Sequence, residues 1–160
     1  MQVQIRRFRE SDEQAVRDLI MRIMDLEFPQ SKVAYPMNDL LDIPGTYGKS
    51  GEAFFVAIKG DSVVGTAAIK REDERTALLR RVFVAPECRR QKIGLTLIDH
   101  AVGFCRENGY EEIIFKTSSK MDGAAQLCRK EGFHQRAKLE MGGLELLKFV
   151  LLLTQSLSHH

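Results

Sequence analysis

The chain has 160 residues, of which 44% are hydrophobic and 29% are charged, and its formal net charge is +2. This length is ordinary for one domain and allows a core that needs no disulfide or metal, and the composition excludes a disordered or fibrous chain. So small a net charge gives no indication of nucleic-acid binding.

The first predicted elements are a strand at residues 2–8 and a helix directly after it. Ser11 opens the helix, and Gln14 stands three residues later, which is the spacing of a capping box. Apolar residues then recur at helical spacing, so one face of this helix is expected to pack on a core. These apolar residues are Val16, Leu19, Ile20 and Ile23.

The least regular part of the chain is residues 27–50, which hold three of the four prolines. A short helix is expected within it, at residues 37–43. Two strands follow, at residues 52–59 and 62–70, and the Gly60-Asp61 pair between them predicts a hairpin turn.

The second half of the chain alternates strands and helices. The charged loop at residues 71–75 leads into it, and Asn108-Gly109 is the usual ending of a helix. The predicted elements are a strand at residues 77–85, a helix at 91–108, a strand at 111–118, a helix at 122–131, and strands at 133–140 and 144–153.

This order of elements predicts an α/β or α+β domain built on one mixed sheet. We expect a single domain over residues 1–154, followed by a tail at residues 155–160. The closing pair, His159-His160, has the composition of a purification-tag remnant.

The cysteines and the apolar segments predict a cytoplasmic protein without a metal. Cys88, Cys105 and Cys128 are odd in number and lack close metal-ligand spacing, so reduced thiols are expected. The first eight residues contain no apolar signal core, and the longest apolar run, residues 149–153, is too short to cross a bilayer. No membrane partner is therefore expected.

The most informative segment is residues 82–97, where a strand, a proline turn and a helix start follow one another. The first turn of a helix has N–H groups without an intrahelical partner, which Ser, Thr, Asp or Asn normally caps. No such residue lies between Arg89 and Lys92, so the positive helix end is open to an anion such as a pyrophosphate. Arg90 adds positive charge, and Gly94 allows close approach to the backbone. The alternative is a solvated basic helix terminus.

This segment resembles the coenzyme-A-binding motif of the GNAT acetyltransferases, a strand ending V-x-P followed by R-x-x-G-x-G at a helix start. Val84, Pro86, Arg89 and Gly94 are in register, whereas Lys92 stands where the first glycine is expected and Arg90 where another is common. A second segment, with Ala124, Leu127, Gly132 and Phe133 in the spacing A-x-x-L-x-x-x-x-G-F, is similar to the other signature of the family.

The resemblance implies a mixed, mostly antiparallel sheet of six or seven strands with helices on both faces. Its parallel pair, the strand ending at Val84 and the strand from Glu111, should splay apart into a cleft. It also implies that acetyl-coenzyme A binds as acyl donor through backbone N–H groups, with a nearby N–H of Phe83 or Val84 facing the oxyanion. The residues that it places at acetyl-coenzyme A are Phe83, Val84, Arg89, Arg90, Gln91, Lys92, Ile93, Gly94 and Leu95.

The catalytic groups are less defined by the resemblance. Cys128 stands where the family has a tyrosine that protonates the leaving thiolate, although a cysteine on the inner face of a helix is commonly a small packing residue. Leu78 stands where related chains often carry a glutamate base. Glu27 and Tyr47, in or beside the segment that would cover the acceptor, are candidates for the base, as are Asp39, Asp42 and Glu72 to Glu74.

The activity expected from the resemblance is direct transfer of an acetyl group to a primary amine of a small molecule or peptide in a ternary complex. The alternative is a module of the same fold that senses acyl-coenzyme A without turnover. The sequence leaves open the acceptor, the acyl-chain length and the oligomeric state, a homodimer included.

Overall fold

Seven strands form one mixed sheet across residues 2–29 and 36–153, the part of the chain that this computed structural model describes. The strand order is β1-β2-β3-β4-β5-β7-β6, and every neighbouring pair is antiparallel except β4 and β5. The predicted mixed sheet is therefore confirmed. The strands are β1 (Val3–Arg7), β2 (Ala53–Lys59), β3 (Ser62–Arg71), β4 (Thr76–Val84), β5 (Glu112–Ser118), β6 (His134–Met141) and β7 (Leu144–Leu152).

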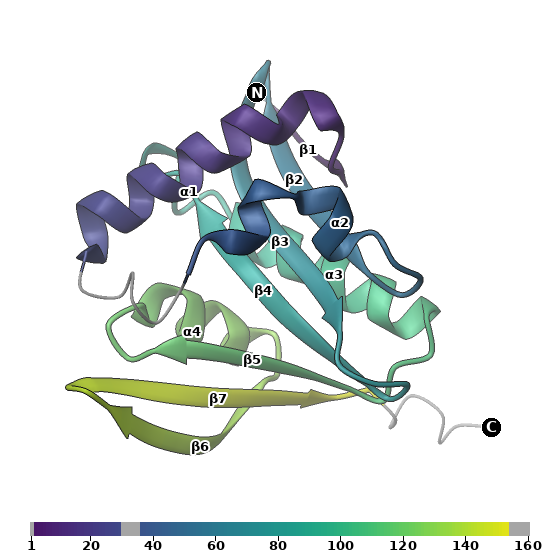
Figure 1. The fold of residues 1–160 in the computed structure, drawn as a ribbon, viewed down its shortest axis with the longest axis vertical. Helices are drawn as coiled ribbons and strands as arrows, with labels where there is room; N and C mark the ends of the chain where they lie inside the picture. The colour runs from purple at the N-terminus through teal and green to yellow at the C-terminus, as the bar shows by residue number, and fades with distance from the viewer. Residues whose placement is uncertain (1, 30–35, 154–160) are drawn as a thin grey trace.

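The parallel pair splays apart as predicted. β4 and β5 are paired from Thr76 and Glu112 as far as Leu79 and Phe115. Beyond that point β4 stays with β3 up to Val84, while β5 stays with β7 up to Ser118. The two halves of the sheet therefore separate toward the carboxyl ends of these two strands, as Figure 1 shows.

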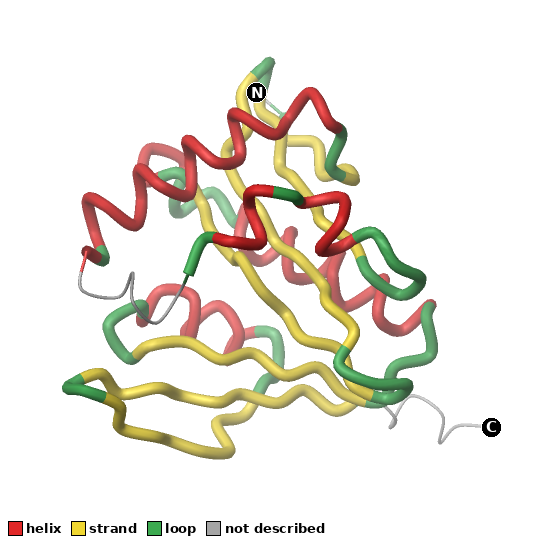
Figure 2. Tube along the Cα trace, viewed as in Figure 1, coloured by secondary structure: helices red, strands yellow, loops and turns green. Residues whose placement is uncertain are grey.

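The helices cover both faces of the sheet (Figures 1 and 2). α1 (Glu13–Glu27) and α2 (Ile43–Tyr47) pack on β3 from one side, and α3 (Ile93–Glu107) packs on β2, β3 and β4 from the other. α4 (Asp122–Lys130) lies on that second side, in contact with α3 and β5. Within the described residues, no helix is both long and apolar enough to span a membrane.

The start of the first helix differs from the prediction. A 3-10 turn at Glu10–Asp12 precedes α1, and Ser11 lies exposed inside it. The Asp12 carboxylate accepts the N–H of Arg9 at 2.8 Å and forms an ion pair with Arg6 at 2.7 Å. The capping box expected at Ser11 and Gln14 is therefore wrong, because the helical turns begin with the 3-10 turn after Arg9, whose N–H is held by Asp12, and α1 itself has no side-chain cap.

The irregular segment holds one helix more than expected. The predicted helix at residues 37–43 is a 3-10 turn, Asn38–Leu41, and α2 follows it. The Asp42 side chain caps α2 by accepting the N–H of Gly45 at 3.0 Å. Pro44 in the first turn is compatible with a helix, because its missing N–H would have no partner there.

A β-bulge interrupts β4 at the point where the cleft begins. Ala68 and Thr66 on β3 oppose Arg80 and Phe83 on β4, so the β4 strand contains one extra residue. Arg81 occupies it with φ of 54°, in the left-handed region that non-glycine residues rarely adopt. The Thr66 hydroxyl donates to the Arg81 carbonyl at 2.6 Å and stabilises this conformation.

Candidate active site

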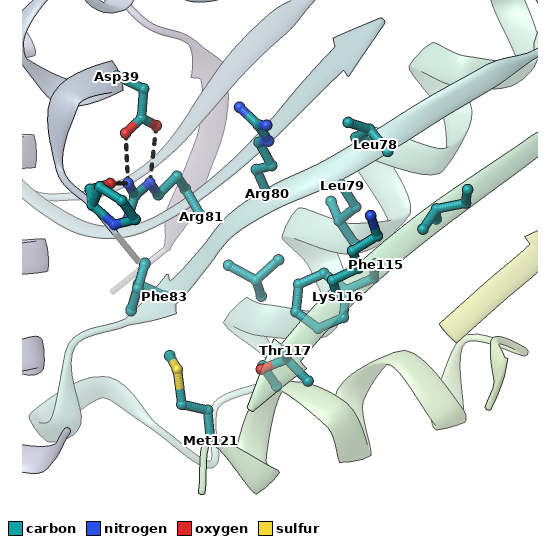
Figure 3. A pocket seen from close by; sticks show the side chains of 14 residues that line it. Asp39, Leu78, Leu79, Arg80, Arg81, Phe83, Phe115, Lys116, Thr117 and Met121 are labelled. Carbon is teal, nitrogen blue, oxygen red and sulfur yellow. Dashed lines mark hydrogen bonds and ion pairs between the residues drawn. The ribbon is translucent and has the colours of Figure 1, made fainter. Parts of the chain in front are cut away.

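A pocket of about 400 Å³ lies between the splayed ends of β4 and β5. Pro36 and Asp39 line it from the side of α2, and Met121 and Ala124 line it from the side of α4. The pocket therefore runs through the sheet from one face to the other. Figure 3 shows the strand residues that border it, among them Leu78, Leu79, Arg80, Phe83, Phe115, Lys116 and Thr117.

The backbone of β4 presents an N–H group on the side of this pocket. The N–H of Ala85 donates to the Val64 carbonyl of β3 at 2.8 Å. Because hydrogen-bonding groups alternate along an antiparallel strand, the N–H of Phe83 also faces β3, and that of Val84 faces the opposite side, from which β5 has diverged. Of the two residues considered for an oxyanion donor, Val84 is therefore the one with the suitable orientation.

An ion pair between Asp39 and Arg81 borders the pocket on the α2 side (Figure 3). Arg81 Nε donates to Asp39 Oδ2 at 2.9 Å, Nη2 donates to Oδ1, and the same Nη2 donates to the Pro36 carbonyl at 2.7 Å. The Tyr47 hydroxyl donates to Asp39 Oδ2 at 2.6 Å. The two ionised side chains are only 8% and 12% exposed, so this is a largely buried pair.

These contacts shift the pKa values of both acidic groups. Burial by itself would raise the pKa of Asp39, but the hydrogen bonds from Arg81 and Tyr47 and the charge of Arg81 outweigh it, so the net pKa lies below the ordinary value. Burial, followed by the hydrogen bond to the Asp39 carboxylate, raises the pKa of Tyr47. Tyr47 therefore stays protonated and committed to Asp39, which makes it poorly suited to the role of a base.

The first turn of α3 is open to an anion. Its N-cap residue, Lys92, provides no side-chain cap, and the first intrahelical bond runs from the Thr96 N–H to the Lys92 carbonyl at 3.0 Å. The N–H groups of Ile93, Gly94 and Leu95 precede it, and none has an acceptor within the described parts of the chain. The positive end of the helix and these donors form an arrangement that phosphate groups commonly occupy.

The loop before α3 adopts a conformation that favours glycine at two positions. Arg90 and Lys92, which stand where the family pattern has glycines, have φ of 66° and 64°. Both side chains are exposed, and neither has an ion-pair partner among residues 2–29 and 36–153. The chain therefore retains the backbone shape of the motif despite the steric cost of a Cβ in the left-handed region.

Arg89 fixes the geometry between β4 and this loop. Its Nε donates to the Val84 carbonyl at 3.2 Å, and its Nη2 forms an ion pair with Glu27 at 3.0 Å. Glu27, a candidate base, is thus held at the end of α1 by Arg89 and does not line the pocket. Gln91, also exposed, accepts a hydrogen bond from Lys59 at 3.0 Å.

Gly94 makes the contact between α3 and α4. A Cβ at this position would lie 2.6 Å from Leu127 Cδ1 and 3.5 Å from Val84 Cγ2. Leu127 is three residues from Ala124 and therefore on the same face of α4 as this pocket-lining residue. The uncapped end of α3 thus lies beside the α4 side of the pocket, and Gly94 is needed for helix packing as well as for any approach of a ligand.

Cys128 is fully buried and is absent from the pocket lining. Burial, with a smaller effect of the Glu131 charge, raises the pKa of its thiol to about 12. Of the further candidates, Asp42 caps α2, and Glu72 to Glu74 lie in the β3–β4 loop, at the end of β4 away from the splay. Leu78 does line the pocket.

Several residues that line the pocket were not singled out from the sequence as site residues, among them Arg80, Lys116 and Met121. Lys116 lies within β5, and the sequence pattern there indicates a strand but not which other segment faces the side chain of Lys116. Within residues 2–29 and 36–153 no group of three or more His, Cys, Asp or Glu side chains has a metal-binding arrangement.

Comparison with known proteins identifies related sequences. A family model described as the acetyltransferase (GNAT) family matches residues 15–133. A probable N-acetyltransferase, camello, of Xenopus laevis is 30% identical over 112 residues, which cover 68% of this chain and 51% of that protein. Human N-acetyltransferase 8 is 33% identical over 101 residues, which cover 59% of this chain and 44% of that protein. The chain thus spans about half the length of these relatives.

Solved structures show the same fold. The crystal structure of a GNAT-family acetyltransferase from Staphylococcus aureus Mu50 matches with a TM-score of 0.80, over 96% of this chain and 100% of that one. The sequence identity is 22%, so this likeness concerns the architecture alone.

Proposed function

Because the chain belongs to the GNAT family of acetyltransferases, we propose that it transfers an acetyl group from acetyl-coenzyme A to a primary amine of a small molecule or peptide, by direct attack in a ternary complex. The observation that carries this proposal is the pocket that runs through the sheet between β4 and β5. Its α4 side adjoins the uncapped start of α3, so two substrates can enter from opposite faces and meet between the strands.

The residues at the start of α3 suit the pyrophosphate of coenzyme A. Backbone N–H groups of residues 93–95 donate, and the positive charges of Arg90 and Lys92 add attraction. Arg89 acts indirectly, since its side chain is engaged by the Val84 carbonyl and Glu27. Side chains at positions 90 and 92 stay exposed, which leaves the backbone accessible.

In the proposed reaction the neutral amine nitrogen attacks the thioester carbonyl carbon and forms the C–N bond of the amide. The C–S bond breaks, coenzyme A leaves as its thiolate, and the proton of the amine is lost to solvent. The Val84 N–H, which points away from β3, is the donor that we place at the developing oxyanion. Much of the rate enhancement then comes from holding two reactants in one pocket, a contribution that does not require a dedicated acid.

We expect Cys128→Ala to retain most of its turnover. A thiol with a pKa of about 12 is a poor proton donor to a leaving thiolate, whose reference pKa is about 8.5. The measurement is kcat against pH at saturating acetyl-coenzyme A, with stability recorded in parallel because a buried side chain is shortened. General-acid catalysis typically contributes about 10²–10⁴-fold, so a loss on that scale would show that Cys128 donates the proton.

The experiment for the proposed function combines binding and turnover. Acetyl-coenzyme A should raise the melting temperature, because it binds the folded state alone. A broad screen of amine acceptors should then release free thiol from acetyl-coenzyme A, in amounts that match the acetylated amine formed. Absence of both binding and thiol release would contradict the proposal. Binding without acetylation of any amine would instead favour a module that senses acyl-coenzyme A.

A further inference from the structure

The pocket has one mouth on the α2 side of the sheet, and that mouth is available to the acceptor. The start of α3, Met121 just before α4, and Ala124 in α4 lie on the opposite side, where the proposed function places coenzyme A. The acceptor amine must therefore approach from the side of Pro36 and Asp39. The charges at this mouth determine which amines it can hold.

Three basic residues form a row on this face. Lys70 of β3 lies directly opposite Leu78 of β4 in the sheet, so the two side chains share a face. The Lys70 amine donates to the Thr46 carbonyl of α2, so this shared face is the one that α2 covers. Leu78 is paired with Ile114, and side chains two residues apart share a face, so Arg80 and Lys116 project to the α2 side as well. Lys148 of β7 is directly opposite Lys116. We call Arg80, Lys116 and Lys148 the basic row.

Among residues 2–29 and 36–153, no acidic side chain pairs with the basic row. Asp39 is already paired with Arg81, and Lys70 is paired with Glu52 at 3.0 Å. None of the three residues of the row has an ion-pair partner within the described chain, and Arg80 interacts with the neutral hydroxyl of Tyr47. Like charges directly opposite in a sheet, as at Lys116 and Lys148, are destabilising. An anion at the mouth would remove this repulsion.

We propose that the acceptor is an amine that also carries a carboxylate, which Arg80 and Lys116 bind at the α2-side mouth of the pocket. This inference rests on the proposed function and narrows its acceptor. Both side chains line the pocket and come from the two strands that border it (Figure 3). Lys148, one strand further, strengthens the positive field.

The same charges assist the chemistry of the amine. A positive neighbour disfavours the protonated form of an amine and lowers its pKa. An ammonium group bound beside the basic row therefore loses its proton to water more easily, which produces the neutral nucleophile without a carboxylate base at Leu78. Acceptors with several positive charges and no carboxylate are repelled from this mouth.

The test compares free amino acids with their C-terminal amides, which differ only in the carboxylate. Binding to the protein saturated with coenzyme A is measured by calorimetry, and turnover is measured separately with acetyl-coenzyme A. Hydrogen bonds to charged groups predict that each preferred acid binds about tenfold to a hundredfold more tightly than its amide. Arg80→Gln and Lys116→Gln should each lower the affinity for the acid toward that for the amide, and should leave the affinity for the amide unchanged. Lys130→Gln, an exposed charge removal on α4, is the matched control.

The outcomes separate the two proposals. Preferential binding of acids, lost in both variants and weakened by salt, supports the carboxylate site even if no acetylated product forms, and in that case the proposed transfer fails instead. Equal binding of acids and amides, equal weakening of both in the variants, or acetylation of neutral amines with no preference for acids would overturn the carboxylate site. So would the absence of binding by every acid in the panel at millimolar concentration.

Discussion

Asp39→Asn should lower the free energy of unfolding by about 3–5 kcal/mol, because removing one partner of a buried ion pair leaves the other charge uncompensated. The Arg81 guanidinium, with its side chain 8% exposed, would then lie beside a neutral amide. That amide has a single acceptor oxygen and cannot accept the hydrogen bonds that the carboxylate takes from Arg81 and from the Tyr47 hydroxyl. For a chain of this length the melting temperature should fall by roughly 6–20 °C. Thermal denaturation at neutral pH measures it.

The pH dependence identifies the cause of this loss. The pKa of Asp39 is lower in the folded than in the unfolded protein. The ionised carboxylate therefore contributes fully to the free energy of unfolding above the pKa of the unfolded state, about 3.9, and this contribution is lost as the pH falls through the pKa of the folded state. The difference in melting temperature between wild type and Asp39→Asn should therefore shrink below about pH 4.

Asp42→Asn is the matched control for Asp39→Asn, since it makes the same change at an exposed helix cap where asparagine also serves. A melting temperature for Asp39→Asn no lower than that of Asp42→Asn would contradict the ascribed role of the ion pair. We also expect Asp39→Asn to weaken acetyl-coenzyme A binding, because Arg81 is the bulge residue that sets the β4 backbone beside Val84.

Gly94→Val should destabilise the fold by about 1–3 kcal/mol and remove most of the rise in melting temperature on adding acetyl-coenzyme A. A valine would press into Leu127 and Val84, which is the usual cost of overpacking a contact. The thermal shift is lost because the side chain lies beside the first-turn N–H groups of α3. Gly103→Val, in the same helix and with no atom within 4 Å of its Cβ, should leave both quantities unchanged within error.

The double variant Gly94→Val with Leu127→Ala separates packing from ligand binding. Shortening Leu127 removes the atom that a Cβ at position 94 meets first, so much of the stability lost in Gly94→Val should return. The coupling energy between the two substitutions should be about 0.5–3 kcal/mol, which is typical of residues in contact. The ligand-induced shift should stay small. Full recovery of that shift would show that Gly94 serves helix packing alone and that coenzyme A does not pass this contact.

Most of the secondary structure was predictable because strands, helices and turns depend on local patterns. Apolar residues at periods of two and 3.6, with glycines at the ends of elements, indicate strands, helices and turns directly. The two glycines at positions 142 and 143, which join β6 to β7, have φ of 53° and 85°. The capping box at Ser11 was wrong because Ser11 lies inside a 3-10 turn, where the Asp12 carboxylate accepts the Arg9 N–H and pairs with Arg6, and α1 begins only at Glu13.

The candidate site also combines features that the local sequence predicts with features that depend on contacts between distant residues. The sequence by itself determined the uncapped start of α3, which follows from one strand–turn–helix segment. It also determined the parallel pair, which follows from the strand–helix–strand connection of β4, α3 and β5. Only the tertiary structure decided that Asp39 meets Arg81, 42 residues away, that Leu127 fills the space beside Gly94, and that Lys116 shares a face with Arg80. Strand register and the bulge in β4 bring these residues together, and both depend on the pairing of distant segments.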